Sequence, residues 1–380
     1  MTFKSLPNRS FSRRAFLGSS AMAACGVAAS FADDAAKFPT VDEEIRRAAG
    51  AAPLKLLFQG NTSAELVAWQ KQFSTELLRR IGPHRPPTQW TSVALSTKEF
   101  DDYVREEWLL QADGVPSLPL YVLRPRTAAP ADGRWPLILA VHGHGPYGND
   151  AVAGVDTTPE RAAEIKELHY DYGRQLVRRG YLVLAPCLTP FGRRLDARFQ
   201  NSKQDQCGVA FVRMMMLGQT LIGANLRDLI WALDYASSRP DARADRIGCV
   251  GLSYGGRMTM LVTAVDPRVR VAVISGALNV MQERIEGAFG CGAQVIPGLL
   301  EIGDTPEIGS LIAPRPCIWE IGSKDKLLPR EWAERAIARL QRAYAATGQP
   351  DNLSIHHFDG GHEWSGTTAV PLLERVLKGG

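Results

Sequence analysis

The sequence predicts an α/β fold: a mainly parallel, doubly wound sheet with helices on both faces. Three observations lead to this class. Short apolar runs such as 137–141 and 271–274 lack polar alternation, as expected for strands that are buried on both faces. Helical patterns separate these runs along most of the chain. The 380 residues also give enough length for one large domain with additional segments.

The composition indicates a globular protein without a nucleic-acid-binding surface. Hydrophobic residues make up 45% of the chain and charged residues 22%, and the formal net charge is only +4. Basic residues are mixed with acidic ones instead of forming a patch. We therefore expect a small-molecule or carbohydrate partner and no nucleic acid. The oligomeric state stays open.

The N-terminus has the pattern of an export signal. Arg13 and Arg14 precede a small, apolar stretch over 18–32, which resembles a twin-arginine signal. The stretch is shorter than the ~20 residues that a membrane span needs. A frayed Ala-rich helix and lipidation of Cys25 are the alternatives. We expect residues 1–32 to be a signal peptide, and the mature protein to be periplasmic or secreted, without a stable membrane span.

Residues 33–100 are expected to form an N-terminal helical extension. An amphipathic helical pattern runs over 41–81, and a stretch rich in proline and glycine follows it. The main domain is expected over 101–380. It begins with a hairpin whose strands lie at 103–111 and 118–124.

The main domain alternates strands and helices in the way that a doubly wound sheet requires. The expected strands are 137–141, 181–185, 247–250, 271–274, 317–321 and 353–358, and the expected helices are 163–179, 222–233, 258–264 and 331–346. Two long stretches, 191–218 and 278–310, interrupt the alternation after the carboxyl ends of strands, where open α/β sheets bind ligands. We expect these lid-like insertions to wall a cleft, with ordinary packing over the sheet edge as the alternative.

The strongest chemical motif is Gly-Leu-Ser-Tyr-Gly at 251–255, between an apolar strand and a helix. A serine in this context stands on a sharp strand-to-helix turn that raises its hydroxyl into a cleft. The two glycines suit a turn that brings backbone segments too close for side chains. We therefore expect Ser253 to be a nucleophile.

A serine hydroxyl needs a base, and the base needs an acid that orients it. His362 follows the last expected strand, which brings it to the same sheet edge as Ser253. Asp325 follows the strand at 317–321, and the order Ser, Asp, His suits this arrangement. Asp359 and Glu320 are the alternatives for the acid.

The oxyanion of an acyl-transfer intermediate needs preorganised donors. The backbone N–H of Tyr254 is one candidate, because it follows the nucleophile. The second donor is expected in the His-Gly-His-Gly loop at 142–145, from either Gly143 or His144. The sequence leaves the choice between these two open.

Together these motifs resemble the α/β-hydrolase superfamily from about residue 103 to the C-terminus. Ser-Arg-Pro at 238–240, Asp-Arg-Ile-Gly at 245–248 and Ala-Pro-Arg-Pro at 313–316 are similar to its dienelactone hydrolase and acetyl-xylan-esterase-like branches. The resemblance implies a carboxylesterase for acylated carbohydrates or small esters, with no metal or organic cofactor. Dienelactone hydrolases proper carry a cysteine at the position of Ser253, and glucuronoyl esterases carry an arginine at that of Tyr254, which argues against both activities.

Five cysteines follow the predicted signal peptide. Cys249 and Cys317 lie in expected core strands, where cysteine acts as a small hydrophobic residue. Cys207 and Cys291 lie in expected loops and could pair after export, which the sequence leaves open. The chain contains no Cys-x-x-Cys or His-x-x-x-His pattern, so we expect no metal site.

The sequence thus predicts an exported serine carboxylesterase that acts through an acyl-enzyme. Two alternatives stand beside it. A prolyl-oligopeptidase-like peptidase would use the same three residues, but the region before residue 103 is too short for a propeller. A catalytically silent binding module on the same fold is the other, since fold alone does not establish function.

Overall fold

The computed structural model describes residues 39–199, 203–285 and 291–379. The predicted signal peptide at 1–32, with Cys25, lies outside these residues. The described chain divides into two compact units, one ending at Ala51 and one running from Ala52 onward. The first contributes α2 (Val41–Gly50), which starts at a capping box formed by Thr40 and Glu43.

The second unit is built on one mixed sheet. In the described residues the sheet has nine strands, in the order β1-β2-β3-β5-β4-β6-β7-β8-β9. They are β1 (Thr91–Glu99), β2 (Tyr103–Gln111), β3 (Leu118–Pro125), β4 (Trp135–Val141), β5 (Leu182–Pro186), β6 (Ala242–Leu252), β7 (Val269–Ser275), β8 (Cys317–Gly322) and β9 (Leu353–Phe358). The pairs from β1 to β5 are antiparallel and those from β5 to β9 are parallel. The predicted hairpin and doubly wound sheet are confirmed.

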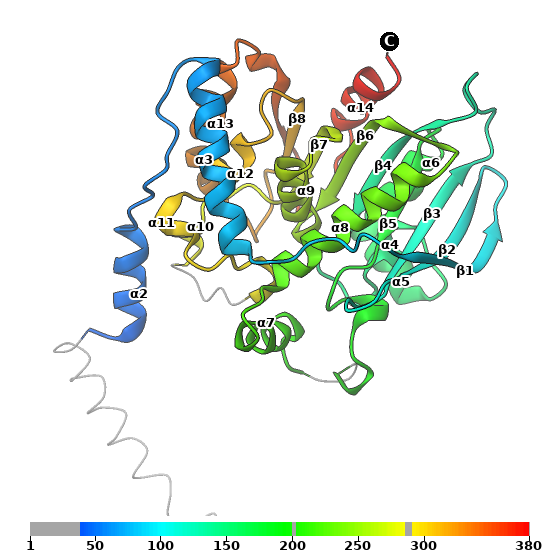
Figure 1. Ribbon diagram of the computed structural model, residues 1–380, viewed down its shortest axis with the longest axis horizontal. Coiled ribbons are helices and arrows are strands. Elements are labelled where there is room, and N and C mark those ends of the chain that lie inside the picture. Colours follow the sequence, from blue (N-terminus) through cyan, green and yellow to red (C-terminus); the bar gives the residue numbers. More distant parts are fainter. Residues whose placement is uncertain (1–38, 200–202, 286–290, 380) are drawn as a thin grey trace, which may run out of the picture. The chain divides into compact units, whose positions relative to one another are not determined.

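Helices cover both faces of the sheet (Figure 1). One face carries α8 (Leu221–Ser238), α9 (Tyr254–Val265), α12 (Thr305–Ser310) and α13 (Arg330–Ala346), with α3 (Ser63–Ile81) packed against α12 and α13. The other face carries α4 (Asn149–Val152), α5 (Pro159–Leu168), α6 (Tyr172–Val177) and α14 (Ala369–Leu377).

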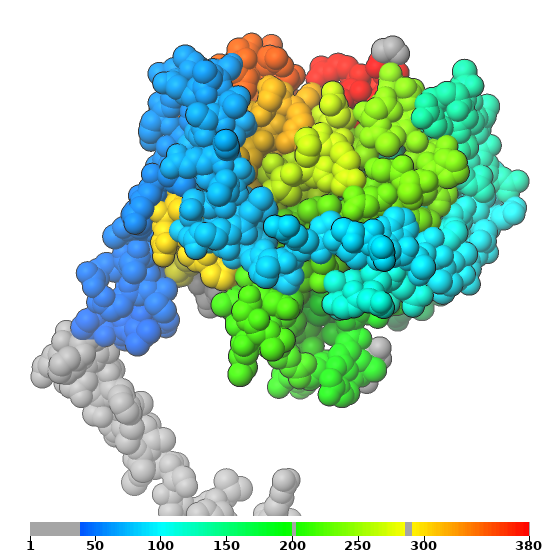
Figure 2. Space-filling model, viewed as in Figure 1, coloured from blue at the N-terminus to red at the C-terminus, as the bar shows by residue number. Residues whose placement is uncertain are grey.

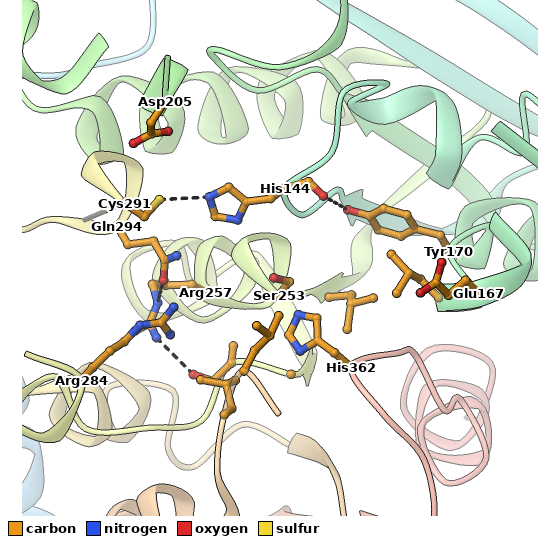
Figure 3. A pocket seen from close by; sticks show the side chains of 16 residues that line it. His144, Glu167, Tyr170, Asp205, Ser253, Arg257, Arg284, Cys291, Gln294 and His362 are labelled. Carbon is orange, nitrogen blue, oxygen red and sulfur yellow. Dashed lines mark hydrogen bonds between the residues drawn. The ribbon is translucent and has the colours of Figure 1, made fainter. Parts of the chain in front are cut away.

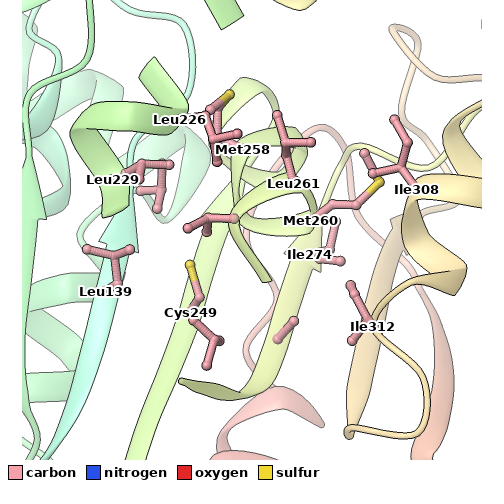
Figure 4. Close-up of a cluster of buried hydrophobic side chains, with 14 of the residues drawn as sticks. Leu139, Leu226, Leu229, Cys249, Met258, Met260, Leu261, Ile274, Ile308 and Ile312 are labelled. Carbon is pink, nitrogen blue, oxygen red and sulfur yellow. The ribbon is translucent and has the colours of Figure 1, made fainter. Parts of the chain in front are cut away.

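Side-chain alternation explains why the strands read as uninterrupted apolar runs. Leu137 and Leu139 of β4 lie in the cluster on the α8 and α9 face, whereas Ile138 and Ala140 lie in the cluster on the opposite face. Figure 4 shows the first cluster, where Leu139 lies near Leu229. Burial on both faces requires an apolar residue at every position of a central strand.

Three regions contain other helices or strands than the sequence predicts. The helical pattern over 41–81 is two helices, because α2 ends at Gly50 and α3 begins only at its own capping box, Thr62 with Glu65. The expected helix over 163–179 is also two, α5 and α6. His169 ends α5 in a left-handed conformation with φ +48°. Finally, the predicted extension at 33–100 contains a strand, β1, whose residues are all exposed.

The two insertions form short helices at the carboxyl edge of the parallel strands. The first holds η1 (Gly192–Arg194), η2 (Ala197–Phe199) and α7 (Gln206–Met216), and the second holds α10 (Met281–Arg284), η3 (Gly292–Gln294), α11 (Leu299–Ile302) and α12. A further 3-10 turn, η4 (Pro350–Asn352), precedes β9. In Figure 2 the green segment with α7 projects from the body of the second unit.

No single helix in the described ranges is long and apolar enough to cross a membrane. The pair α7 and α8 reaches the required length and hydropathy only when both are taken together, and they are bent by 95°.

Candidate active site

Ser253 stands on the sharp turn that the sequence predicts. It lies between the end of β6 and the start of α9, and its φ of +61° is a left-handed value that a serine rarely adopts. A Cβ at Gly255 would lie 2.0 Å from the Val141 carbonyl oxygen, and one at Gly251 would lie 2.3 Å from the Gly255 oxygen. Glycine at both positions therefore lets β4, β6 and α9 approach closely enough to form the turn.

Asp325 and His362 form a pair beside this turn. The Nδ1 atom of His362 lies 2.7 Å from Oδ2 of Asp325. The backbone N–H groups of Leu327 and Leu328 donate to Oδ1, at 2.8 and 3.1 Å. These two bonds fix the carboxylate so that its other oxygen faces the imidazole.

The two alternative acids have other partners. Asp359 is exposed and pairs with the Lys324 ammonium at 2.7 Å. Glu320 is 1% exposed and accepts hydrogen bonds from the Ser275 hydroxyl and the Gly366 amide. Glu320 therefore links β7 and β8 to the segment before α14, and burial raises its pKa.

The other ring nitrogen of His362, Nε2, is buried and has no hydrogen-bond partner among the described residues. His362 and Ser253 both line a cavity of about 750 Å³, and Figure 3 shows them next to each other. The arrangement leaves Nε2 available for a proton from a hydroxyl group in the cavity.

The loop after β4 lies against the nucleophile turn. A Cβ at Gly143 would meet the Leu252 carbonyl oxygen at 2.6 Å and the Ser253 Cβ at 3.0 Å, so only glycine fits. The Gly143 N–H already donates to the Tyr170 hydroxyl, at 2.6 Å. The neighbouring His144 N–H makes no hydrogen bond among the described residues.

His142 holds the base of the same loop. The Leu188 amide donates to its Nε2 at 2.8 Å, and its Nδ1 lies 2.8 Å from the Gly143 oxygen. Full burial lowers the pKa of His142 to about 4, so the ring is neutral at physiological pH. Neither Tyr170 nor the role of His142 follows from sequence spacing, because both depend on contacts between distant segments.

Both insertions contribute to the wall of the cavity, as predicted. Asp205 comes from the first, and Arg284, Cys291 and Gln294 come from the second. Arg257 of α9 is 4% exposed and donates to Gln294 Oε1 at 2.8 Å, which ties the second insertion to the helix that follows Ser253. Burial, with the nearby Arg284, lowers the pKa of Arg257 to about 9.

A sulfur-rich cluster lies at one side of the cavity. Cys291 Sγ is 3.0 Å from His144 Nε2, and the Cys207 thiol lies beside both. All five cysteines in the described residues are free. The sequence suggests a pairing of Cys207 with Cys291 but gives no signal for His144, and it predicts a loop at Cys207, whereas Cys207 is a buried residue of α7.

Comparison with known proteins identifies the family. Residues 51–363 match the model of the Abhydrolase family. The chain belongs to this family. The match covers most of the chain and confirms the predicted α/β-hydrolase fold and hydrolase class.

Relatives of this Abhydrolase protein support the same fold. A Bacillus subtilis (strain 168) protein, the proposed hydrolase YtaP, is 28% identical over 302 residues, which is 76% of this chain and 92% of the relative. A proposed acetyl xylan esterase from Bacteroides fragilis NCTC 9343 superposes with a TM-score of 0.69 at 21% identity, covering 84% of this chain and 83% of that one. A glucuronoyl esterase from Solibacter usitatus has a TM-score of 0.60 at 14% identity, covering 85% and 96%.

Proposed function

We propose that this Abhydrolase protein is a serine carboxylesterase. The observation that carries the proposal is the Asp325–His362 pair: His362 lines the same cavity as Ser253, and its Nε2 has no partner among the described residues. A nucleophile, a base and an orienting acid in this geometry are what acyl transfer to a serine requires.

The proposed reaction has two halves. His362 Nε2 takes the proton of Ser253 as Oγ attacks the ester carbonyl, and Asp325 stabilises the imidazolium that forms. The protonated His362 then gives its proton to the leaving alcohol, and an acyl-enzyme remains. Water, activated by His362, attacks the acyl-enzyme in the same way and releases the acid.

The Tyr254 and His144 amides are the proposed oxyanion donors. Tyr254 is the first residue of α9, and the amides of a helix's first turn have no partner within the helix. We favour His144 over Gly143 because the Gly143 N–H already donates to Tyr170. One such donor contributes about 3 kcal/mol to transition-state stabilisation in well-studied hydrolases.

Acylated carbohydrates are the proposed substrate class. Two structural neighbours are named as a proposed acetyl xylan esterase and a glucuronoyl esterase. The proposed export by the twin-arginine signal would bring the enzyme to polysaccharides outside the cytoplasm.

The proposal is tested with p-nitrophenyl acetate, butyrate and octanoate and with acetylated xylan. We expect turnover that Ser253→Ala abolishes and that Ser323→Ala, an exposed serine near Asp325, leaves unchanged. A fluorophosphonate probe should label the wild type and not Ser253→Ala. A folded protein that neither hydrolyses any ester nor reacts with the probe would support the silent binding module instead. Cleavage of peptides but not esters would support the peptidase.

Export is tested separately by fractionation. A chain with Arg13→Lys and Arg14→Lys should stay in the cytoplasm as the full-length precursor, whereas the wild type is exported and shortened. Export of the double variant at the wild-type level would contradict a twin-arginine signal.

A further inference from the structure

Three side chains with soft or borderline donor atoms meet at the edge of the cavity. His144 Nε2, Cys207 Sγ and Cys291 Sγ all lie within 4.8 Å of one another. His144 belongs to the loop after β4, Cys207 to the first turn of α7, and Cys291 to the segment before η3. Figure 3 shows the His144 ring directed at Cys291.

The donor set and its spacing suit a zinc ion. Two thiolates and one imidazole are common zinc ligands, at about 2.3 Å for sulfur and about 2.0 Å for nitrogen. Tetrahedral ligands at those lengths stand about 3.4–3.8 Å from one another. Here His144 Nε2 and Cys291 Sγ are 3.0 Å apart, and all three donor atoms lie within 4.8 Å of one another, which is close to that spacing. We propose that His144, Cys207 and Cys291 form a zinc-binding site.

The surroundings of His144 already fix its ring in place. The imidazole packs edge-on to the Phe191 ring, with centroids 5.4 Å apart, and against the Tyr254 ring at 5.2 Å. An imidazole that is held in position before the metal arrives loses less side-chain freedom on binding.

His144 and Cys291 line the cavity, so a fourth ligand can reach the cluster from it. Asp205 is nearby, but its two carboxylate oxygens accept the amides of Cys207 and Gly208 and so cap α7. Water or a substrate oxygen therefore completes the tetrahedron. Three protein ligands with one open position are typical of zinc sites that contact a substrate, and Cys₂His is a known set.

Zinc at this position connects three parts of the cavity wall. It joins α7 of the first insertion to Cys291 of the second, and both to the loop that carries the His144 amide. The zinc site is independent of ester hydrolysis, since the three donors are close together whatever reaction the cavity supports.

Metal content tests the site without an activity assay. The full chain is purified with a non-thiol reductant, loaded with zinc sulfate and dialysed, and zinc per chain is measured by plasma mass spectrometry. We expect one zinc in the wild type. Loss of an outer-shell partner typically lowers metal affinity by ~10–100-fold. Cys207→Ser and Cys291→Ser each remove a direct ligand, so their zinc affinity should fall by more than this. Cys187→Ser is the control, because Cys187 is also buried and donates to the Phe191 oxygen outside the cluster.

Cobalt(II) gives a readout that is specific to sulfur ligation. The wild type and Cys187→Ser should show a thiolate-to-cobalt charge-transfer band and the visible bands of tetrahedral cobalt, and both cluster variants should lose them. Circular dichroism checks that each variant is folded. If one cluster variant unfolds, the other variant and the wild-type spectrum still decide the question.

Several outcomes would overturn the site. One is a wild type that retains no zinc and gives cobalt no thiolate band. Another is zinc retention by both cluster variants at the level of the control. A third is a disulfide in place of the metal site. Mass spectrometry of the chain purified without reductant would then show a mass lower by two hydrogens and a peptide that links Cys207 to Cys291, and the reduced chain would bind no zinc. The pair would then serve only as a disulfide.

Discussion

The imidazole of His362 is positioned by protein contacts on two sides. Asp325 holds Nδ1, and Gly276 lies next to Cε1. Nε2 has no partner among the described residues, so it is the nitrogen that can exchange a proton with a hydroxyl group or water. Substitutions at Asp325 and Gly276 therefore test the proposed role of His362.

Removing the charge of Asp325 tests the acid. Asp325→Asn keeps the size of the side chain but replaces an acceptor by an amide, so the wrong His362 tautomer is favoured. We expect kcat on p-nitrophenyl acetate to fall by about 10⁴-fold, as when the triad aspartate of another serine hydrolase is replaced by asparagine. Asp359→Asn is the matched control, because Asp359 pairs with Lys324 at the surface. Equal losses in the two variants would contradict the assignment.

Gly276 tests the position of the ring. Its φ is +55°, and a Cβ there would lie 3.0 Å from His362 Cε1. Gly276→Ala should lower kcat by displacing the ring, and the left-handed backbone should cost about 1–2 kcal/mol of stability. Gly348→Ala is the control, since its φ is +71° and a Cβ there meets nothing within 4 Å. The control should lose stability but keep kcat; a similar loss of kcat in both variants would refute a steric effect on His362.

At the scale of elements, α9 connects the nucleophile turn to the second insertion through Arg257. The guanidinium donates to Gln294 and Thr305, and to Asn279 at 2.5 Å. Three side-chain oxygens of the second insertion thus accept hydrogen bonds from one buried guanidinium. The wall of the cavity is therefore coupled to the helix that begins at Tyr254.

Loss of that cation should loosen the wall. Arg257→Met leaves buried acceptors without donors, each costing about 1–3 kcal/mol, so we expect unfolding free energy to fall by more than about 2 kcal/mol. Arg330→Met removes an arginine that is 58% exposed on α13 and should change stability by less than about 1 kcal/mol. Urea denaturation followed by circular dichroism measures both. A small effect of Arg257→Met would show that the insertion does not depend on this contact.

Elements with a strong apolar pattern could be predicted, and those set by local backbone conformation or long-range contacts could not. The apolar run at 317–321 matches β8 to within one residue, and every residue of that strand is buried. The break between α5 and α6 depends on the left-handed His169, which no side-chain periodicity reveals. β1 was missed because all its residues are exposed, so burial leaves no pattern in its sequence.

The candidate site divides in the same way. Ser253, Asp325 and His362 could be predicted because each follows an apolar strand, and the carboxyl ends of parallel strands share one edge of the sheet. Their catalytic roles stay predictions until the variants are measured. Only the approach of Cys207 to Cys291 could be suggested from the sequence. The place of His144 beside them could not, since 147 positions separate His144 from Cys291 and only the packing of the two insertions against the loop after β4 brings the three together.

At the scale of the whole molecule, pH should shift stability through Glu164. This residue lies on α5, one of its carboxylate oxygens is buried without a partner among the described residues, and burial raises its pKa to about 6. Above pH 6 the folded state holds a poorly solvated charge that the unfolded chain exposes to water. Below the ordinary value of 4.5 both states are protonated, so the penalty is absent.

Glu164→Gln should therefore stabilise the protein at pH 8 and have no effect at pH 4. The shift corresponds to at most about 2 kcal/mol, and we expect about 1 kcal/mol because the side chain is only partly buried and solvent screens it. Urea midpoints at the two pH values measure the difference. Glu331→Gln, an exposed glutamate on α13 far from Glu164 in the chain, should change the midpoint little at either pH. A gain that persists at pH 4 would come from packing or helix propensity, and would contradict a charge penalty at Glu164.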